Sequence, residues 1–137
     1  MIVSTRGRYA LRVLIDMAEH DAHKDYIPLK EVAERQEISE KYLEAIVKLL
    51  VKEKVLSGLR GKGGGYKLTK KPSELSVGEV LTITEGDIAV VSCLANTPEK
   101  CPRAKTCKTV AMWTKLDNMV SDYLYSIKLS DLIKKDN

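Results

Sequence analysis

Three cysteines gather in one short polar segment of this 137-residue chain. Seven residues separate Cys93 from Cys101, and five separate Cys101 from Cys107. Structural zinc sites usually begin with two cysteines about two to four residues apart, and this segment contains no such pair. Clustered thiols in a polar loop are instead typical of soft-metal ligation or redox sensing. Iron–sulfur clusters take cysteine thiolates, tolerate wider spacing and accept a non-cysteine ligand at an exposed iron.

Basic side chains surround the three thiols in the sequence. A cationic neighbour favours the thiolate, which is the form that binds metals and reacts with oxidants. The segment supplies four such neighbours: Lys100, Arg103, Lys105 and Lys108. Three incidental cysteines would be the simplest alternative, but a loop this polar is a poor setting for them. We therefore expect metal or cluster binding here, with direct thiol oxidation as the alternative.

Positive charge is concentrated in the middle of the chain. The whole chain has a net charge of +4, but residues 41–71 contain nine basic and two acidic side chains, a local net of +7. Residues 73–137 contain eight basic and nine acidic side chains, a net of −1. Such a local excess is expected of a protein that binds a polyanion. A solvated charged face would give the same count, so charge alone does not decide between the two.

The bulk composition is that of an ordinary soluble protein with an aliphatic core. Hydrophobic residues make up 44% and charged residues 31%, and there is no phenylalanine. The length suits one compact domain, or a small domain with an appended element. No apolar run approaches the roughly 18 residues needed to span a bilayer, and the N-terminus lacks the pattern of a signal peptide. We expect a cytoplasmic protein without a membrane partner, in which three cysteines do not form a disulfide framework.

The region before the positive segment has the pattern of a helix-turn-helix. Ser4 is a suitable N-cap for a helix to about His20, Pro28 opens a second, short helix, and Ser39 caps a third to about Lys54. The third helix would bury Leu43, Ile46, Val47 and Leu50, and would expose Lys41, Glu44, Lys48 and Lys52. In a helix-turn-helix the second helix of the pair can enter a major groove, although helix pairs are common in any small α protein.

A short hairpin follows the third helix. Residues 55–60 and 66–69 alternate like strands, and the glycine-rich segment 61–65 must turn sharply between them. Glycines permit positive φ angles and let the backbone approach a phosphate chain closely. A P-loop would need the string GxxxxGK[ST], which is absent, and a dinucleotide fingerprint would be followed by a helix rather than by a strand. A helix-turn-helix with a basic hairpin is a winged helix, so the expected fold is mainly α with a small β-hairpin wing.

The second half of the chain predicts one short and one long helix. Ser76 caps the short helix, which ends before Gly86. Residues 109–127 form the long helix, whose apolar stripe comprises Val110, Trp113, Leu116, Val120, Tyr123, Leu124 and Ile127. This helix has too little partner surface in its own chain, so we expect a homodimer through residues 109–127, with packing on the first helix as the alternative. Ser130 would cap a last helix over 131–135. The predicted units are a DNA-binding domain, 1–72, and a sensor and dimerisation region, 73–137.

Five segments occur in an order that resembles a known family. They are STRGRYALRVL, ISEKYLEAIVKLL, LRGKGGGYKL, LSVGEVL and the three-cysteine loop, and they cover nearly the whole chain. In this order they resemble the Rrf2 family of bacterial winged-helix transcription regulators, which includes the IscR, NsrR and RirA types. The cysteine spacing is closest to the RirA type. The resemblance implies homodimers on pseudo-palindromic DNA operators. It also implies that Cys93, Cys101 and Cys107 hold a [2Fe–2S] or [4Fe–4S] cluster, which a preparation exposed to air can lack.

The resemblance also implies roles for residues of the reading surface. Tyr42 and Glu44 match the Tyr-Leu-Glu of the recognition helix, and Arg60 matches the wing arginine that enters the minor groove. The basic and glycine positions expected to contact phosphate are Lys41, Lys48, Lys62, Gly63 and Gly64. Lys41 replaces the serine of the IscR type, so operator preference is expected to differ.

The fourth ligand of such a cluster is left open by the sequence. The histidine that serves in the IscR type is replaced by Val110, and the aspartate used by some NsrR-type proteins is replaced by Arg8. The remaining candidates are water, a small thiol, Glu85, Asp87 and Glu99. We expect both histidines, His20 and His23, to be surface residues.

These observations leave three candidate functions. The first is a DNA-binding regulator, expected to be a repressor, gated by an iron–sulfur cluster that senses iron, oxygen, nitric oxide or redox state. The second is the same winged-helix regulator without a cluster, responding to thiol oxidation or to a protein partner. An enzyme with a reactive cysteine is the third, and neither a CxxC motif nor a His–Cys pairing supports it.

Overall fold

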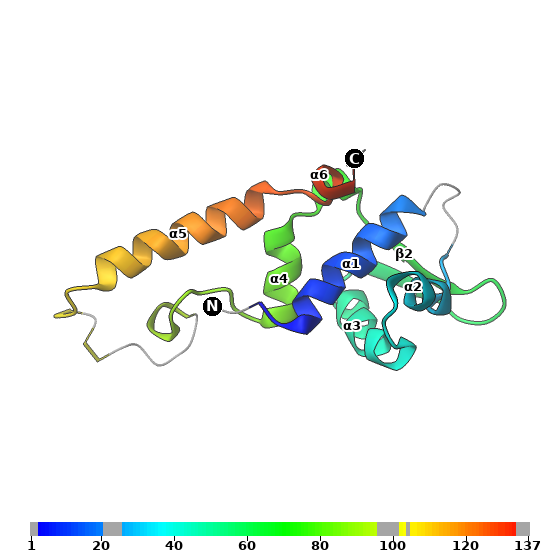
Figure 1. Cartoon of the computed structure of the whole chain (residues 1–137), viewed down its shortest axis with the longest axis horizontal. Helices are drawn as coiled ribbons and strands as arrows, with labels where there is room; N and C mark the ends of the chain where they lie inside the picture. The colour runs from blue at the N-terminus through cyan, green and yellow to red at the C-terminus, as the bar shows by residue number, and fades with distance from the viewer. Residues whose placement is uncertain (1–2, 21–25, 96–101, 104, 134–137) are drawn as a thin grey trace.

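The computed structural model describes residues 3–20, 26–95, 102–103 and 105–133. Figure 1 shows a mainly helical molecule with one hairpin, which confirms the predicted fold class. The helices are α1 (Thr5–Glu19), α2 (Leu29–Gln36), α3 (Glu40–Lys52), α4 (Val77–Glu85), α5 (Val110–Ser126) and α6 (Leu129–Ile133). The strands are β1 (Leu56–Leu59) and β2 (Gly65–Leu68), and two 3-10 turns are η1 (Pro72–Glu74) and η2 (Ser92–Leu94).

Serine caps start three of these helices where the sequence predicts them. The hydroxyl of Ser4 accepts a hydrogen bond from the Gly7 amide at 3.1 Å, and those of Ser39 and Ser76 do the same at α3 and α4, at 3.1 and 3.0 Å. Each cap satisfies an amide that has no partner within the helix. Gly86, with φ of 81°, ends α4 as predicted.

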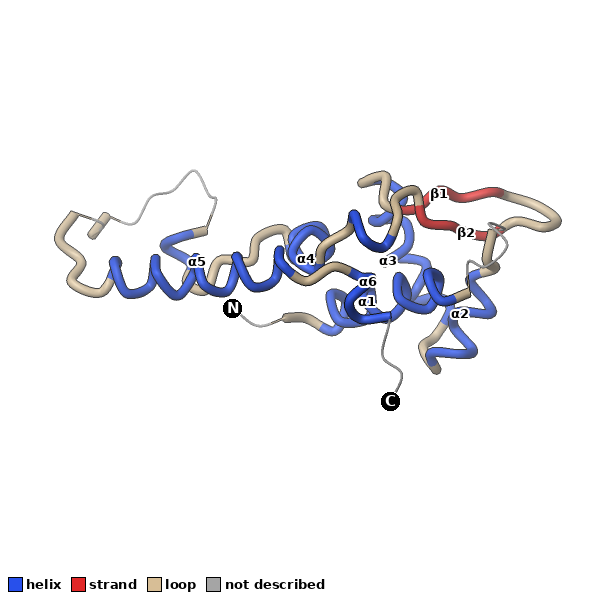
Figure 2. The backbone as a smooth tube through the Cα atoms, turned by 90° about the horizontal axis from the view of Figure 1, so that it is seen from above, coloured by secondary structure: helices blue, strands red, loops and turns tan. Residues whose placement is uncertain are grey.

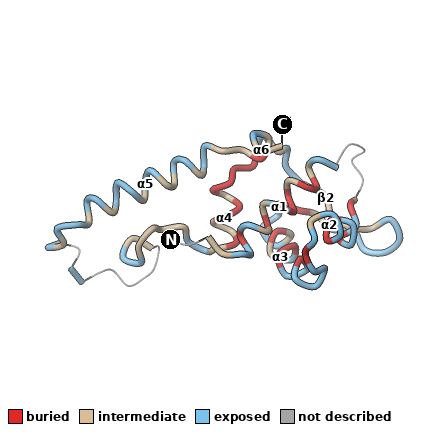
Figure 3. The backbone as a smooth tube through the Cα atoms, in the orientation of Figure 1, coloured by how far each residue is buried: buried red, intermediate tan, exposed pale blue. Residues whose placement is uncertain are grey.

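The helix-turn-helix is closed by a left-handed residue and packed around an aliphatic core. Glu37 follows α2 with φ of 56°, and the amide of Ile38 returns to the carbonyl of Ala33 at 3.1 Å. This turn sends the chain into α3, and Ile38 is buried beneath it. The buried face of α3 is the predicted one: Leu43, Ile46, Val47 and Leu50. It belongs to the same buried cluster as apolar residues of α1 and α2. Figure 3 colours the buried stretches of this part of the chain red.

A third segment of chain holds the wing to the rest of the predicted DNA-binding domain, residues 1–72, which is called the reader below. β1 and β2 are antiparallel, with Leu56 opposite Leu68 and Gly58 opposite Tyr66. Tyr66 also exchanges two backbone hydrogen bonds with Ile27, just before α2, at 2.8 and 2.9 Å. Gly65 has φ of 148°, and a Cβ there would lie 2.3 Å from the Ile27 carbonyl oxygen. Only glycine therefore fits at the place where the wing meets this connection.

Helix α5 extends away from the reader and contributes no buried residue (Figures 1 and 3). It lies at the opposite end of the molecule from the wing, as Figure 2 shows. Its last turn is attached to α4, where the hydroxyls of Thr82 and Tyr125 lie 2.9 Å apart and Gly78 leaves room for the Tyr125 ring. Although α5 is apolar along one side, no helix among the described residues is long and apolar enough to cross a membrane.

After α5 the chain returns to the reader, and the predicted start of the last helix is wrong. Helix α6 begins at Leu129, before the predicted cap Ser130, because Leu129 is fully buried in the reader core. The carboxylate of Asp131 accepts from the Lys128 amide at 2.9 Å and closes the helix start. Lys128 also pairs with Ser76 as an isolated β-bridge. The predicted last residues of this helix lie outside the described ones.

One core continues across the predicted division between residues 72 and 73. Leu75, Val80 and Leu129 pack in the same cluster as the buried residues of α1 and α3. The two-unit division of the chain stays a prediction.

Candidate nucleic-acid interface and cysteine segment

The outward face of α3 presents the side chains predicted for DNA reading. Lys41, Glu44 and Lys48 are exposed, and Tyr42 exposes 40% of its surface. The periodicity of the helix explains this arrangement, because the residues between the buried positions must face solvent. Tyr42 also meets α1, through the ring of Tyr9.

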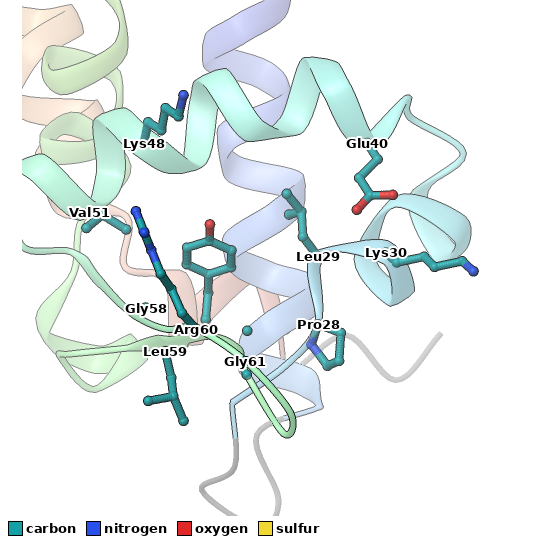
Figure 4. Close-up of a pocket in the computed structure, with 13 residues that line it drawn as sticks. Pro28, Leu29, Lys30, Glu40, Lys48, Val51, Gly58, Leu59, Arg60 and Gly61 are labelled. Carbon is teal, nitrogen blue, oxygen red and sulfur yellow. The ribbon is translucent and has the colours of Figure 1, made fainter.

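A hollow of about 560 Å³ separates α3 from the wing and the start of α2. Lys48 and Val51 line it from α3, and Arg60 lines it from the end of β1. In Figure 4 the Arg60 side chain extends from the wing toward α3, on the same side of the hollow as Lys48. Glu40 is an acidic group at the opposite end of this hollow, near Leu29. The structure therefore brings the predicted helix and wing cations together across one groove.

The tip of the wing has a backbone that requires glycine. Gly61 and Gly63 have φ of 93° and 76°, in the left-handed region that side chains disfavour. A Cβ on Gly64 would lie 2.3 Å from the Leu59 carbonyl oxygen. Lys62 and Gly63 are exposed at this tip. A turn with one lysine and bare backbone on either side can approach a phosphate closely.

Two groups at this surface lie outside the positively charged window of the sequence. Thr5 and Arg6, at the start of α1, share a second hollow with Tyr42 and Ala45 of α3. Lys30, at the start of α2, lines the hollow beside the wing. Counting charge over contiguous residues misses them, because tertiary packing brings them to α3. The only signal in the sequence is the conspicuous STRGR string at the N-terminus.

A buried carboxylate fixes α1 against α2. Asp16 is 2% exposed and accepts hydrogen bonds from Arg35 at 2.7 and 3.0 Å and from the Gln36 side chain at 2.9 Å. Burial alone would raise the pKa of Asp16, but the hydrogen bonds from Arg35 and Gln36 and the Arg35 charge outweigh it and lower this pKa. His20 is exposed, as predicted, with Nδ1 2.7 Å from the Asp16 carbonyl oxygen. His23 lies outside the described residues.

The described cysteines flank the predicted sensor segment and carry free thiols. Cys93 is exposed in η2, and Cys107 is half-buried just before α5. Cys101 lies outside the described residues. Hydrogen bonds from the Thr109 hydroxyl and from the backbone amides of Thr109 and Val110 lower the pKa of the Cys107 thiol, and Arg103 adds a smaller effect. The amides at the start of α5 thus favour the thiolate more than the surrounding basic side chains do.

The candidate fourth ligands that the structure describes are engaged by other groups. Glu85 Oε1 accepts hydrogen bonds from the Ser4 hydroxyl at 2.5 Å and from its amide at 3.2 Å. The Asp87 carboxylate accepts one from the Ala89 amide at 2.8 Å. Glu99 lies outside the described residues. Within the parts of the chain that the structure describes, no three histidine, cysteine or acidic side chains form a group able to hold a metal ion.

The end of α4 and the segment that follows it are each hydrogen-bonded to another part of the molecule. Glu85, the last residue of α4, accepts hydrogen bonds from the hydroxyl and the amide of Ser4, the cap of α1. Further along, the Val90 amide donates to the carboxylate of Asp117 on α5 at 2.9 Å. The segment between α4 and Cys93 is therefore connected to the long helix α5, and α4, which precedes it, is connected to the start of α1.

Comparison with known proteins gives one consistent result. The pattern of the Rrf2 family, described as iron-dependent transcriptional regulators, matches residues 3–135. The transcriptional regulator IscR of Erwinia tasmaniensis is 35% identical over 133 residues, covering 97% of this chain and 79% of that protein. The solved structure of CymR, the global cysteine regulator of B. subtilis, superposes with a TM-score of 0.79 at 29% identity, covering 100% of this chain and 99% of CymR. T. potens IscR superposes with a TM-score of 0.74 at 30% identity, covering 98% of this chain and 87% of that one.

Proposed function

Because the chain belongs to the Rrf2 family of transcriptional regulators, we propose that it is a homodimeric repressor whose operator binding is gated by an iron–sulfur cluster on Cys93, Cys101 and Cys107. The DNA half of this proposal is carried by one observation. Lys48 of α3 and Arg60 of the wing, 12 residues apart in sequence, line a single exposed groove. The family is one of regulators rather than of enzymes, in agreement with the sequence prediction.

The reading face divides into contacts that position the protein and contacts that select the sequence. Lysines at positions 41, 48 and 62 would meet phosphates and make the affinity depend on salt. Tyr42 and Glu44 would face base edges in the major groove, and Arg60 would enter the adjacent minor groove. Gly63 and Gly64 would let the wing backbone approach the phosphate chain.

Helix α5 is the proposed dimer contact. Its exposed side chains include Leu116, Met119 and Tyr123, exposed by 41%, 60% and 66%. A second copy related by a twofold axis would cover this face and place two reading surfaces on a palindromic operator. The spacing of the two half-sites would then be set by the geometry of α5.

The described thiols suit an iron–sulfur cluster in their donor chemistry. Cys107 has a lowered pKa, so its thiolate is favoured, and Cys93 is exposed and free to ligate. Cys101 would supply the third thiolate, and the fourth ligand stays open among water, a small thiol, Glu85, Asp87 and Glu99. When bound, a cluster of this kind responds to iron supply, oxygen or nitric oxide.

Gating would act through the Val90–Asp117 hydrogen bond and through the hydrogen bonds between Ser4 and Glu85, which directly precedes the cysteine-bearing segment. A rearrangement of this segment would pull on Asp117 through the Val90 amide and on Ser4 through Glu85. Movement of Asp117 would alter how the two α5 helices of the proposed dimer sit against each other. Movement of Ser4 would alter the start of α1 beside Tyr42. Half-site recognition tolerates little change in spacing, so a modest shift would release the operator.

The second candidate is the same DNA-binding regulator without a cluster. It would respond to thiol oxidation or to a protein partner. The lowered pKa of Cys107 favours thiol oxidation, because the thiolate is the form that oxidants attack. S. aureus CymR, with a TM-score of 0.75 and 28% identity over all of this chain and 99% of CymR, has been solved in a form described as oxidized. Both candidates assign the activity to the cytoplasm, where DNA and reduced thiols coexist.

One preparation separates the two candidates. The protein is purified anaerobically, and its visible spectrum and iron content are measured for the wild type and for Cys101→Ala. Cluster gating predicts coloured, iron-containing wild-type protein and loss of colour and iron in the variant. Iron-free anaerobic protein would contradict the cluster, and operator binding that responds to thiol oxidants would then support the second candidate.

The DNA half is tested separately with a duplex selected by the wild-type protein from random-sequence DNA. Arg60→Ala is expected to raise the dissociation constant by about 5- to 150-fold, since one groove contact contributes about 1–3 kcal/mol. Circular dichroism should show an unchanged fold. Lys115→Ala, which removes one exposed cation from α5, is the control. Equal affinities for all three proteins would contradict the wing assignment.

A further inference from the structure

The exposed Tyr42 on the recognition helix is supported from behind by a second tyrosine. Tyr9 of α1 meets it edge to face, with ring centroids 5.6 Å apart and ring planes at 82°. The two rings differ in their surroundings. Tyr9 is half-buried against the core, whereas Tyr42 is exposed on the reading face.

Tyr9 is itself in contact with a cation of its own helix. The guanidinium carbon of Arg12, one helical turn further along α1, lies 5.1 Å from the centroid of the Tyr9 ring. Arg12 donates hydrogen bonds to the side-chain oxygen of Gln36, at 3.1 Å, and to the Gln36 carbonyl oxygen. Gln36 in turn donates to the buried carboxylate of Asp16 at 2.9 Å. A continuous series of contacts therefore runs from a buried anion to the ring of Tyr42.

The backbone of Tyr42 is fixed independently of this series. Its amide donates to the Ser39 hydroxyl at 3.1 Å, which caps α3. Capping fixes where the Cα of Tyr42 lies but leaves the side-chain torsions open. An exposed tyrosine on a helix normally exchanges between rotamers, and an edge-to-face partner favours one of them. A side chain that is already in its binding rotamer loses less entropy on contact with a ligand.

We propose that Tyr9, braced by Arg12, is a positioning residue that holds Tyr42 in the orientation required for operator discrimination. The inference rests on the proposed function, in which Tyr42 contacts the groove. Tyr9 touches no DNA in this arrangement. It acts on sequence selection rather than on general affinity, because the phosphate contacts of α3 and the wing do not pass through it.

The test uses the full chain and the duplex selected from random-sequence DNA. Dissociation constants are measured for this duplex and for a scrambled duplex of equal length, with wild type, Tyr9→Leu, Tyr9→Phe and Tyr42→Ala. Discrimination is the dissociation constant for the scrambled duplex divided by that for the selected duplex. Tyr9→Leu is expected to reduce this ratio by about 2- to 12-fold, which corresponds to the loss of one edge-to-face pair. Tyr9→Phe retains the ring and should keep the wild-type ratio. The salt dependence of binding should be the same in all four proteins, since no phosphate contact is removed.

A double-mutant cycle distinguishes positioning from general destabilisation. In the Tyr42→Ala background, Tyr9→Leu should cause no further loss of discrimination, because the side chain that it positions is already absent. Should Tyr9→Leu fail to fold by circular dichroism, Arg12→Lys replaces it. This variant retains the charge but loses the paired hydrogen bonds to Gln36, and it should lower discrimination in the same direction, by less.

The outcomes separate this inference from the proposed function. Unchanged discrimination in Tyr42→Ala would show that Tyr42 does not read the operator, and the proposed role of this residue would fail first. A loss in Tyr42→Ala together with wild-type discrimination in Tyr9→Leu would overturn only the positioning role. An equal loss from Tyr9→Leu with and without Tyr42 would show a structural effect and would also overturn it.

Discussion

Helices α3 and α5 have similar apolar stripes in the sequence but opposite surroundings in the structure. The stripe of α3 is fully buried beneath α1 and α2, whereas α5, which is four residues longer, has no buried residue. An apolar stripe shows that a helix face must be covered, but it does not show by which molecule. The core around α3 is completed within one chain, whereas we propose that a second copy covers the face of α5.

The largest loss of stability is expected from a substitution in the buried face of α3. Leu50→Ala removes a fully buried side chain from α3 and should lower the free energy of unfolding by about 2–5 kcal/mol. Urea denaturation followed by circular dichroism measures it. The loss should be the same at all protein concentrations, because α3 packs within its own chain. A loss that grows on dilution would instead place α3 at an interface between copies.

The clamp between α1 and α2 gives the next largest effect and a defined pH dependence. Arg35→Ala leaves Asp16 buried with Gln36 as its remaining side-chain hydrogen-bond donor and should cost about 1.5–3 kcal/mol at pH 7. The pKa of Asp16 is lowered on folding, so the folded chain binds fewer protons than the unfolded chain near the ordinary pKa. The contribution is complete above about pH 4 and is lost as the pH falls through the folded pKa.

The difference in unfolding free energy between wild type and Arg35→Ala should therefore shrink as the pH falls below about 4. Urea denaturation at a series of pH values measures this difference. In an Asp16→Asn background, where residue 16 cannot ionise, the effect of Arg35→Ala on the free energy of unfolding should not depend on pH in this range. A difference that stays constant down to pH 2 would show that the clamp does not act through the charge of Asp16.

The same chemical change on α5 should act on association rather than on folding. Leu116→Ala removes a side chain that is 41% exposed in the single chain. It should raise the dimer dissociation constant by about tenfold in sedimentation velocity, since burial of an apolar side chain stabilises the interface. Lys115→Ala, at the neighbouring position, is the control. A wild-type protein that stays monomeric at high concentration would contradict the proposed dimer.

The smallest effect is expected at the link between the two regions. Ser4→Ala removes both the cap of α1 and the hydrogen bond to Glu85, and should cost about 1 kcal/mol in urea denaturation. Glu85→Gln keeps a hydrogen-bond acceptor but loses the charge, and should cost less. If this link carries gating, both variants should also reduce the difference in operator affinity between the anaerobic and the air-exposed protein. Equal gating in wild type and both variants would remove this route.

Local signals in the sequence were sufficient for most elements of the fold. Ser4, Ser39 and Ser76 mark helix starts through hydrogen bonds that span three residues, and the buried face of α3 follows from the helical period. The wing was found from its glycines, since Gly63 and Gly65 have backbone angles that few other residues adopt. The start of α6 was missed. Ser130 is a good cap by type, but the burial of Leu129 in a core formed by distant segments places the helix start two residues earlier than predicted.

The candidate site divides in the same way. The outward lysines and Tyr42 of α3 could be predicted, because exposure on one helix is a local property. Basic neighbours predict a lowered pKa of Cys107, but hydrogen bonds from the Thr109 hydroxyl and from the amides of Thr109 and Val110 each lower it more than Arg103 does. Roles of the individual DNA-reading residues, the cluster and its fourth ligand stay predictions.

The sequence by itself determined which segments are helical, which faces must be covered and where positive charge gathers. Only the tertiary structure decided that Ile27 completes the wing, that Asp16 clamps Arg35, and that Tyr9 stands behind Tyr42. These pairs lie 39, 19 and 33 residues apart, and neither member of a pair has a local pattern that names its partner. The reason is physical. Caps and periodicity act within one helical turn, whereas contacts between elements depend on how all buried faces pack together.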